Sequence, residues 1–138
     1  MNHKQSGVAL LEAVIATLIL AIGLLGAVGL QARAYSVLSD AGMRAEATIA
    51  SDKLIGMMTV DQANLASYAY GGTGVPNAKL AAWYNETRAN IPNAAITVTV
   101  TPVPLTFRTN VGVRIGWTRK TGGQPSWHAV TSYIAQSL

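Results

Sequence analysis

The side chain with the clearest chemical consequence is Glu12, because it is the one charge in a long apolar stretch. The 23 residues 8–30 are apolar or small except for Glu12 and Thr17. As a helix they span roughly 34 Å, enough to cross a hydrocarbon core of about 30 Å. An acid inside such a core costs roughly 2.5 to 3.5 kcal/mol, so its presence indicates a function and a partner of opposite charge.

A suitable partner would be an amino terminus created by cleavage between Gly7 and Val8. Residues four apart share a helix face, so the ammonium group of Val8 and the carboxylate of Glu12 can neutralise each other, within one chain or between neighbours. An apolar medium favours such pairing of charges. This interpretation is a class III signal, in which the apolar segment is retained after cleavage.

Two other interpretations of the N-terminus remain open. An ordinary secretory signal has an apolar core of about 7 to 15 residues followed by an Ala-x-Ala site. Residues 32–34 (Ala-Arg-Ala) fit that site loosely, but the apolar segment is too long. A plain membrane anchor is the simplest alternative, although it gives no reason for Glu12. For an anchored chain, Lys4 predicts a cytoplasmic N-terminus and an external remainder.

No second group of residues suggests catalysis or metal binding. There is no cysteine, which excludes thiolate zinc sites, a cysteine nucleophile and disulfides. His3 precedes the predicted cleavage position at Gly7, and His128 has no other histidine near it in the sequence. Four further acids are not spaced as a catalytic pair of carboxylates would be. They are Asp40, Asp52, Asp61 and Glu86. We therefore expect neither enzymatic activity nor a cofactor.

The basic residues suggest a weaker alternative. The net charge of +4 comes from 10 Lys and Arg against 6 Asp and Glu, which is too modest and dispersed to indicate nucleic acid by itself. A DNA-binding or surface-binding patch at Arg108, Arg114, Arg119 and Lys120 competes with the simpler interpretation of a solvated basic edge. Nucleic acid is therefore not an expected partner.

The N-terminal residues resemble a known family. The run SGVALLEAVIATLILAIGLLGAVGLQ resembles the leader and helix of type IV pilins, and AIGLLGAVGLQ resembles the PilV group of minor pilins. The resemblance implies cleavage at Gly7 by a prepilin peptidase, N-methylation of Val8 and a role for Glu12 in assembly. The family usually has Gly-Phe at the cut, where this chain has Gly7-Val8; an apolar substitution there leaves the membrane segment intact.

The helix that positions Glu12 is expected to continue well beyond the apolar segment. Gly23, Gly26 and Gly29 form either a strip for close helix packing in a membrane or a set of generic small residues. No proline occurs before Pro76, and helix formers continue to Met58. Two apolar stripes follow the helical period. They are Ala34, Leu38, Ala41, Ala45 and Ile49, and Met43, Ala47, Ala50, Leu54 and Met57/Met58. One stripe would face the chain's own sheet and the other its neighbours, unless both are covered within one domain.

The remaining residues predict a small sheet and one short helix. Residues 59–78 are expected to form a loop, and Asn77 to cap a helix that carries Trp83 in the core. Residues 96–101 and 111–117 alternate as half-buried strands, and a third strand, 127–134, has no assignable buried face. The predicted class is α+β, a long N-terminal helix packed on an antiparallel sheet of three to four strands.

The resemblance extends to these segments and completes the prediction. AKLAAWYNETRANIPNAAITVTV and VRIGWTRK resemble a short helix and two strands of PilV-type proteins, which implies a pilin fold. The implied parts are a leader (1–7), a transmembrane and assembly half of the helix (8–30) and a periplasmic globular domain (31–138).

The function implied is structural. The expected protein is a minor pilin that takes part in type IV pilus assembly, in the initiating tip complex or in the fibre. Its expected partners are other minor pilins, the major pilin and the prepilin peptidase. It would lie in the inner membrane before assembly and in the extracellular pilus afterwards. The alternatives are a minor pseudopilin of type II secretion and a pilus-borne adhesin or DNA-binding subunit.

Overall fold

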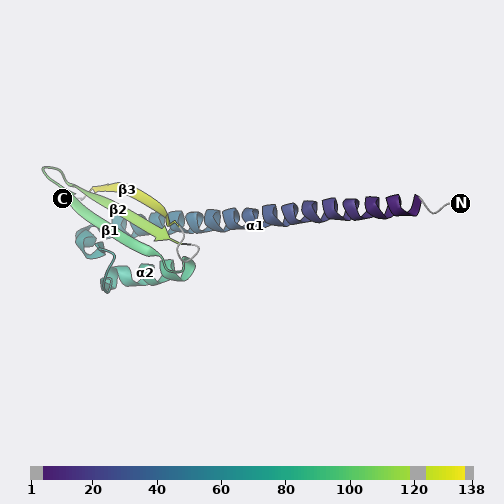
Figure 1. The fold of residues 1–138 in the computed structure, drawn as a ribbon. Helices are drawn as coiled ribbons and strands as arrows, with labels where there is room; N and C mark the ends of the chain where they lie inside the picture. The colour runs from purple at the N-terminus through teal and green to yellow at the C-terminus, as the bar shows by residue number, and fades with distance from the viewer. Residues whose placement is uncertain (1–4, 119–123, 136–138) are drawn as a thin grey trace. The chain divides into compact units, whose positions relative to one another are not determined.

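The computed structural model describes residues 5–118 and 124–135 as one long helix followed by two short helices and a sheet (Figure 1). In chain order the elements are α1 (Gln5–Val60), the 3-10 helix η1 (Gln62–Tyr68), α2 (Ala78–Asn90), β1 (Ala95–Val103), β2 (Arg108–Trp117) and β3 (Ser126–Ala135). The described residues are therefore α+β, as predicted.

The first element, α1, confirms the prediction of a single helix that continues past the apolar segment. Its sequence contains no proline, and the helix is unbroken across Gly23, Gly26 and Gly29. It ends at Val60, where the amide of Asp61 donates a last hydrogen bond to Met57 O at 3.1 Å. The chain divides into two compact units, one that ends at Ser39 and one that begins at Asp40.

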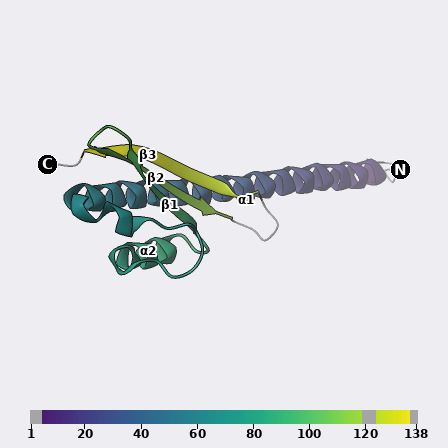
Figure 2. The same ribbon diagram turned by 90° about the vertical axis from the view of Figure 1, so that its left-hand side faces the viewer.

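Among the described residues the sheet has three strands, which form an antiparallel meander in the order β1-β2-β3. Val98 lies opposite Val113, which in turn lies opposite Val130. Short links between successive strands favour this topology. Figures 1 and 2 show the strands running alongside the C-terminal part of α1, with α2 next to the same part.

The core of the second unit lies where α1, α2 and the sheet meet. From α1 it contains Ala47, Leu54 and Met58, all fully buried, which belong to the second predicted stripe. From β2 it contains Val111, Val113, Ile115 and Trp117, the alternate residues of one sheet face. Burial of these side chains is the main favourable term for folding, at about 25 cal/mol per Å² of apolar surface.

The short helix α2 is capped and packed as predicted. The side chain of Asn77 accepts a hydrogen bond from the backbone amide of Lys79 at 3.1 Å, which satisfies one of the free donors at the helix start. Trp83 is buried, and its Nε1 donates to Ala50 O of α1 at 2.8 Å. This hydrogen bond ties α2 to α1.

The prediction of a loop over residues 59–78 was wrong for its first part. The residues that follow α1 form η1, which buries Leu65 and Tyr68. These two side chains are three residues apart, which is the period of a 3-10 helix, so they share one face. The glycines and the proline that suggested a loop occur only after η1, at 71–76.

The structure also assigns the buried face of β3. Its even-numbered residues are more buried than the odd-numbered ones, and Ile134 is fully within the core. His128 and Val130 lie opposite Ile115 and Val113, which are buried. The even residues therefore face the core, and Trp127 and Tyr133 lie on the outer face of the sheet.

A cluster around the carboxylate of Asp61 links the end of α1 to η1 and α2. Its oxygens accept hydrogen bonds from Asn64 Nδ2 at 2.6 Å, Tyr68 OH at 3.0 Å and Lys79 Nζ at 2.5 Å. The hydrogen bond from Lys79, followed by that from Asn64, lowers the pKa of Asp61 from 3.8 to about 2. The folded state therefore favours the ionised acid.

The lowered pKa of Asp61 predicts a loss of stability in acid. Because the folded pKa lies below the unfolded one, the contribution is fully present above about pH 4 and is lost as the pH falls through about 2. We expect the melting temperature of the full chain in detergent to fall over this interval, and to fall less in Asp61→Asn. An equal pH dependence in both proteins would contradict the assignment. Lys79→Met, which removes the partner of the carboxylate, should also weaken the dependence.

Candidate functional site

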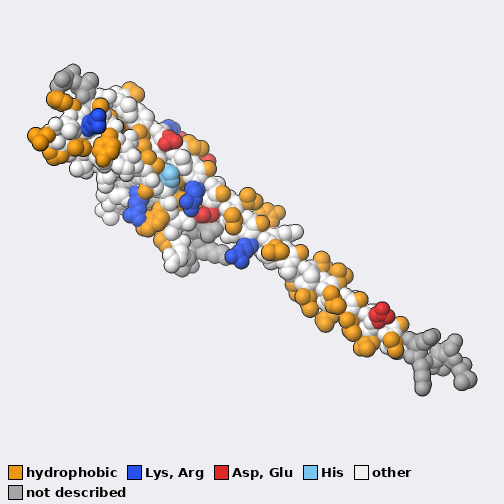
Figure 3. Space-filling view, turned by 90° about the horizontal axis from the view of Figure 1, so that it is seen from above, with side chains coloured by type: hydrophobic (Ala, Val, Ile, Leu, Met, Phe, Trp, Pro, Cys, Tyr) orange, Lys and Arg blue, Asp and Glu red, His pale blue; other side chains and the backbone are white. Residues whose placement is uncertain are grey.

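The apolar segment, residues 8–30 of α1, is exposed on all sides, because no described residue outside the helix packs against it. Its large hydrophobic side chains are 48% to 72% exposed. Figure 3 shows hydrophobic side chains along its visible side. The helix is long and apolar enough to cross a membrane. Because exposed apolar surface is unfavourable in water, contact of this segment with lipid or with other helices would be favourable.

The structure places Glu12 on the surface of this segment. Glu12 and Val8 lie on the same helix face, one turn apart, and line a shallow open surface with Leu11, Ile15, Ala16 and Ile19. None of the described residues forms a hydrogen bond or an ion pair with Glu12. The carboxylate is therefore exposed among aliphatic side chains and has no counter-charge among the described residues.

The predicted cleavage position lies inside the same helix. Gly7 and Val8 both belong to α1 and are exposed, so in the uncleaved chain the nitrogen of Val8 is a peptide nitrogen. A side chain at Gly7 would meet no described atom within 4 Å. Cutting the Gly7-Val8 bond would turn this nitrogen into an ammonium group one helical turn before Glu12, close enough for electrostatic pairing.

The glycine strip has no packing partner among the described residues. A Cβ at Gly23, Gly26 or Gly29 would meet nothing within 4 Å. Each glycine costs about 1 kcal/mol in a helix interior relative to alanine, and here no contact within the described chain compensates for that cost. The strip is free for close approach by another helix.

The first predicted stripe of α1 is exposed along its length. Leu38 and Ile49 are 66% and 61% exposed, and Ala34, Ala41 and Ala45 are exposed too. The other stripe packs in the core of the second unit. The two faces of α1 beyond residue 40 therefore differ, and one apolar face is left uncovered by the described residues.

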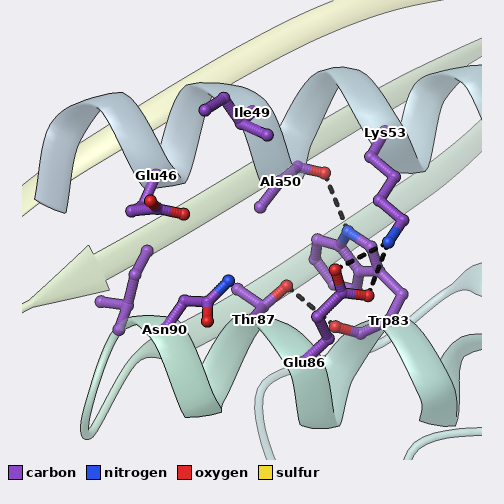
Figure 4. A pocket seen from close by; sticks show the side chains of 9 residues that line it. Glu46, Ile49, Ala50, Lys53, Trp83, Glu86, Thr87 and Asn90 are labelled. Carbon is purple, nitrogen blue, oxygen red and sulfur yellow. Dashed lines mark hydrogen bonds and ion pairs between the residues drawn. The ribbon is translucent and has the colours of Figure 1, made fainter.

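A small, partly open hollow between α1 and α2 has too little room for a substrate. The cavity in Figure 4 has a volume of about 30 Å³, which is room for a single water molecule. Lys53 Nζ and Glu86 Oε2 close one side of it with an ion pair at 2.6 Å, and Trp83 forms part of its wall. Both charged side chains are about half exposed, so this pair contributes little to stability.

Two further candidates from the sequence have distinct environments. His128 is half-buried on the inner face of β3, and its Nε2 has no hydrogen-bond partner among the described residues. Arg114 lies on the outer face, where its guanidinium stacks on the ring of Trp127 at 3.3 Å. Arg108 is exposed, and Arg119 and Lys120 lie outside the described residues. The patch of four basic residues therefore stays a prediction, of which the described residues include only Arg108 and Arg114, both on β2.

Sequence reasoning missed two polar contacts that position the elements. One is the Asp61 cluster, and the other is the hydrogen bond from Trp117 Nε1 to Asp40 Oδ1 at 3.0 Å. Asp40 and Trp117 are 77 residues apart in the sequence, so no local pattern relates them. The one hint of this contact in the sequence was the position of Asp40, an acid three residues before the start of the buried stripe.

Comparison of the chain with protein-family models, with curated proteins and with solved structures returned no match.

Proposed function

We propose that the protein is a minor pilin, a structural subunit that takes part in the assembly of a type IV pilus and has a pilin fold. The observation that carries the proposal is an exposed apolar helix with a single acid, Glu12, which no described residue pairs with and which lies one turn after the Gly7-Val8 bond. The long helix packed on a small antiparallel sheet is compatible with that fold.

Before assembly, residues 8–30 lie in the inner membrane, with the N-terminus in the cytoplasm and the globular unit in the periplasm. A prepilin peptidase cuts between Gly7 and Val8, and the new amino terminus is N-methylated. The helix then moves from lipid into a bundle formed by the helices of other minor pilins and of the major pilin.

Glu12 favours transfer of the helix from lipid into the bundle and sets the axial alignment of neighbouring helices. In lipid its ionised carboxylate is costly. In the bundle the carboxylate pairs with the amino terminus of a neighbouring subunit, which relieves part of that cost because opposite charges attract strongly at low dielectric. The pairing fixes the axial position of one helix against the next. Gly23, Gly26 and Gly29 allow the helices to approach closely.

The part of α1 that follows the apolar segment supplies contact surfaces to neighbouring subunits. The exposed stripe that includes Leu38 and Ile49 supports this role, because uncovered apolar surface on a helix marks an interaction site. The role proposed for the protein is therefore structural rather than catalytic.

The direct test is the mature N-terminus of the protein extracted from the membrane of its own cells. We expect mass spectrometry to find a chain that begins at Val8 and carries one additional methyl group. The same protein from cells without prepilin peptidase is the control and should keep its leader. A chain that begins at Met1, or at Ala34 or beyond, would refute the proposal.

A further inference from the structure

The outer face of the sheet, which points away from the core, carries an open hollow of about 260 Å³. This volume is close to the lower end of the range for small-molecule sites, roughly 300 to 1,000 Å³. All three strands contribute residues that lie opposite one another in the register. The side chains on the outer face that line this outer-face hollow are those of Thr97, Thr99, Arg114, Ala129 and Thr131, together with Gly112.

The hollow has its depth because the middle strand lacks a side chain at Gly112. This glycine lies opposite Thr99 on β1 and Thr131 on β3. A Cβ at Gly112 would come within 2.5 Å of Thr99 Oγ1, which is closer than the Cβ contacts of real proteins. Glycine in a strand interior weakens the strand, and it often marks a place that a ligand approaches closely.

Arg114 supplies the positive charge of the outer-face hollow. Its guanidinium stacks on the ring of Trp127, with Cζ at 3.3 Å from the ring centroid. Stacking uses the flat face of the guanidinium, so the N–H donors, which lie in its plane, stay available at its edges. The contact also restricts the side chain to fewer rotamers, which lowers the entropy cost of binding a ligand there.

No acid among the described residues neutralises this charge. The sequences of β1, β2 and β3 contain no Asp or Glu. Arg114 is exposed and takes part in none of the ion pairs within the described chain. A guanidinium of this kind is complementary to a carboxylate, which it can bind through two parallel hydrogen bonds. The charge of the hollow therefore favours an anionic ligand.

The remaining groups of the hollow indicate a saccharide as the carrier of the carboxylate. Its three threonine hydroxyls can each donate and accept hydrogen bonds, which suits a ligand with several neighbouring hydroxyl groups. A fatty acid would need an apolar lining, and a nucleic acid would need several cations along its phosphates. A peptide strand would need free backbone groups, but β2 is the middle strand and is paired on both sides.

We propose that the outer-face hollow binds a saccharide that carries a carboxylate, such as a uronic acid unit. Arg114 binds the carboxylate, and Trp127 holds the guanidinium in place. The hydroxyls of Thr99 and Thr131 bind hydroxyl groups of the sugar. The site belongs to the second unit and does not depend on the function proposed for the apolar segment.

Binding of fluorescently labelled tetragalacturonic acid tests the proposal. The full chain is titrated at neutral pH in an uncharged detergent without a sugar headgroup, and fluorescence anisotropy gives the affinity. The fully methyl-esterified tetramer is the matched probe, since it keeps the sugar rings and removes the charges. We expect the acid to bind at least tenfold more tightly, because hydrogen bonds to charged groups contribute more than those to neutral groups. Equal binding of the two probes, or no binding of the acid, would overturn the proposal.

Two arginine variants of β2 locate the site. Arg114→Met removes the charge and should weaken binding of the acid at least tenfold. Arg108→Met makes the same change on the same strand but outside the hollow, and should bind as the unaltered chain does. Circular dichroism and melting temperatures show whether both variants are folded. Equal losses of binding in the two variants would indicate a diffuse effect of charge and contradict the assignment.

One hydroxyl variant and one competing ligand complete the test. Thr131→Val keeps the shape of the side chain and removes its hydroxyl, so it should weaken binding of the acid about threefold to tenfold. A thymidine oligonucleotide should bind less tightly than the acid at the same salt concentration. Tighter binding of the oligonucleotide, reduced in both arginine variants, would identify a nucleic-acid surface instead and refute the saccharide site.

Discussion

Glu12→Ala is expected to reach the membrane in normal amounts and to be reduced at least tenfold in sheared pili. Removing the acid lowers the cost of keeping the helix in lipid by roughly 2.5 to 3.5 kcal/mol, so insertion is not impaired. In the proposed function, the same change removes the charge that would pair with the amino terminus of a neighbouring subunit. The helix would therefore remain in the membrane and lose the interaction that draws it into the bundle.

Two further variants show whether the effect on assembly comes from the charge of Glu12 or from the size of its side chain. Glu12→Gln keeps the size of the side chain and removes the charge, so it should behave like Glu12→Ala. Glu46→Ala changes an acid on the second half of α1 and should assemble normally. The measurement is the ratio of subunit in purified pili to subunit in membranes, determined by immunoblotting. Normal incorporation of Glu12→Ala would overturn the role given to this residue.

The sequence predicted those parts of the fold that depend on local patterns. The helix α1 followed from helix formers without proline, and α2 from the cap at Asn77. The strands β1 and β2 followed from strict alternation of apolar residues with threonine, glycine or arginine. Each of these signals lies within a few residues of the element that it predicts, so no knowledge of the tertiary structure was needed.

The features that the sequence did not reveal depend on distant residues. The buried face of β3 was undetermined because both faces mix apolar and polar residues, and only pairing with β2 decides between them. Asp61 had no visible partner, since Lys79 is 18 residues away in the sequence and approaches only when α2 folds back. Glu12 was recognisable because its unusual property, a charge among apolar neighbours, is local.

Trp83→Ala should be the most destabilising single change in the second unit, because Trp83 is at once a large core side chain and a buried link between α2 and α1. Truncating a buried aromatic side chain leaves a cavity and costs about 3 to 5 kcal/mol. For a unit of this size such a loss lowers the melting temperature by more than about 12 °C.

Two further variants separate the contributions of packing and hydrogen bonding in this link. Trp83→Phe keeps most of the apolar area and loses the 2.8 Å hydrogen bond to Ala50 O, so it should cost about 1 to 2 kcal/mol. Trp127→Ala removes the same side chain from the exposed face of the sheet and should cost less than about 1 kcal/mol. Thermal unfolding of the full chain in detergent, followed by circular dichroism, gives all three values. Equal destabilisation by Trp83→Ala and Trp127→Ala would show that the contact between α1 and α2 does not hold the second unit together.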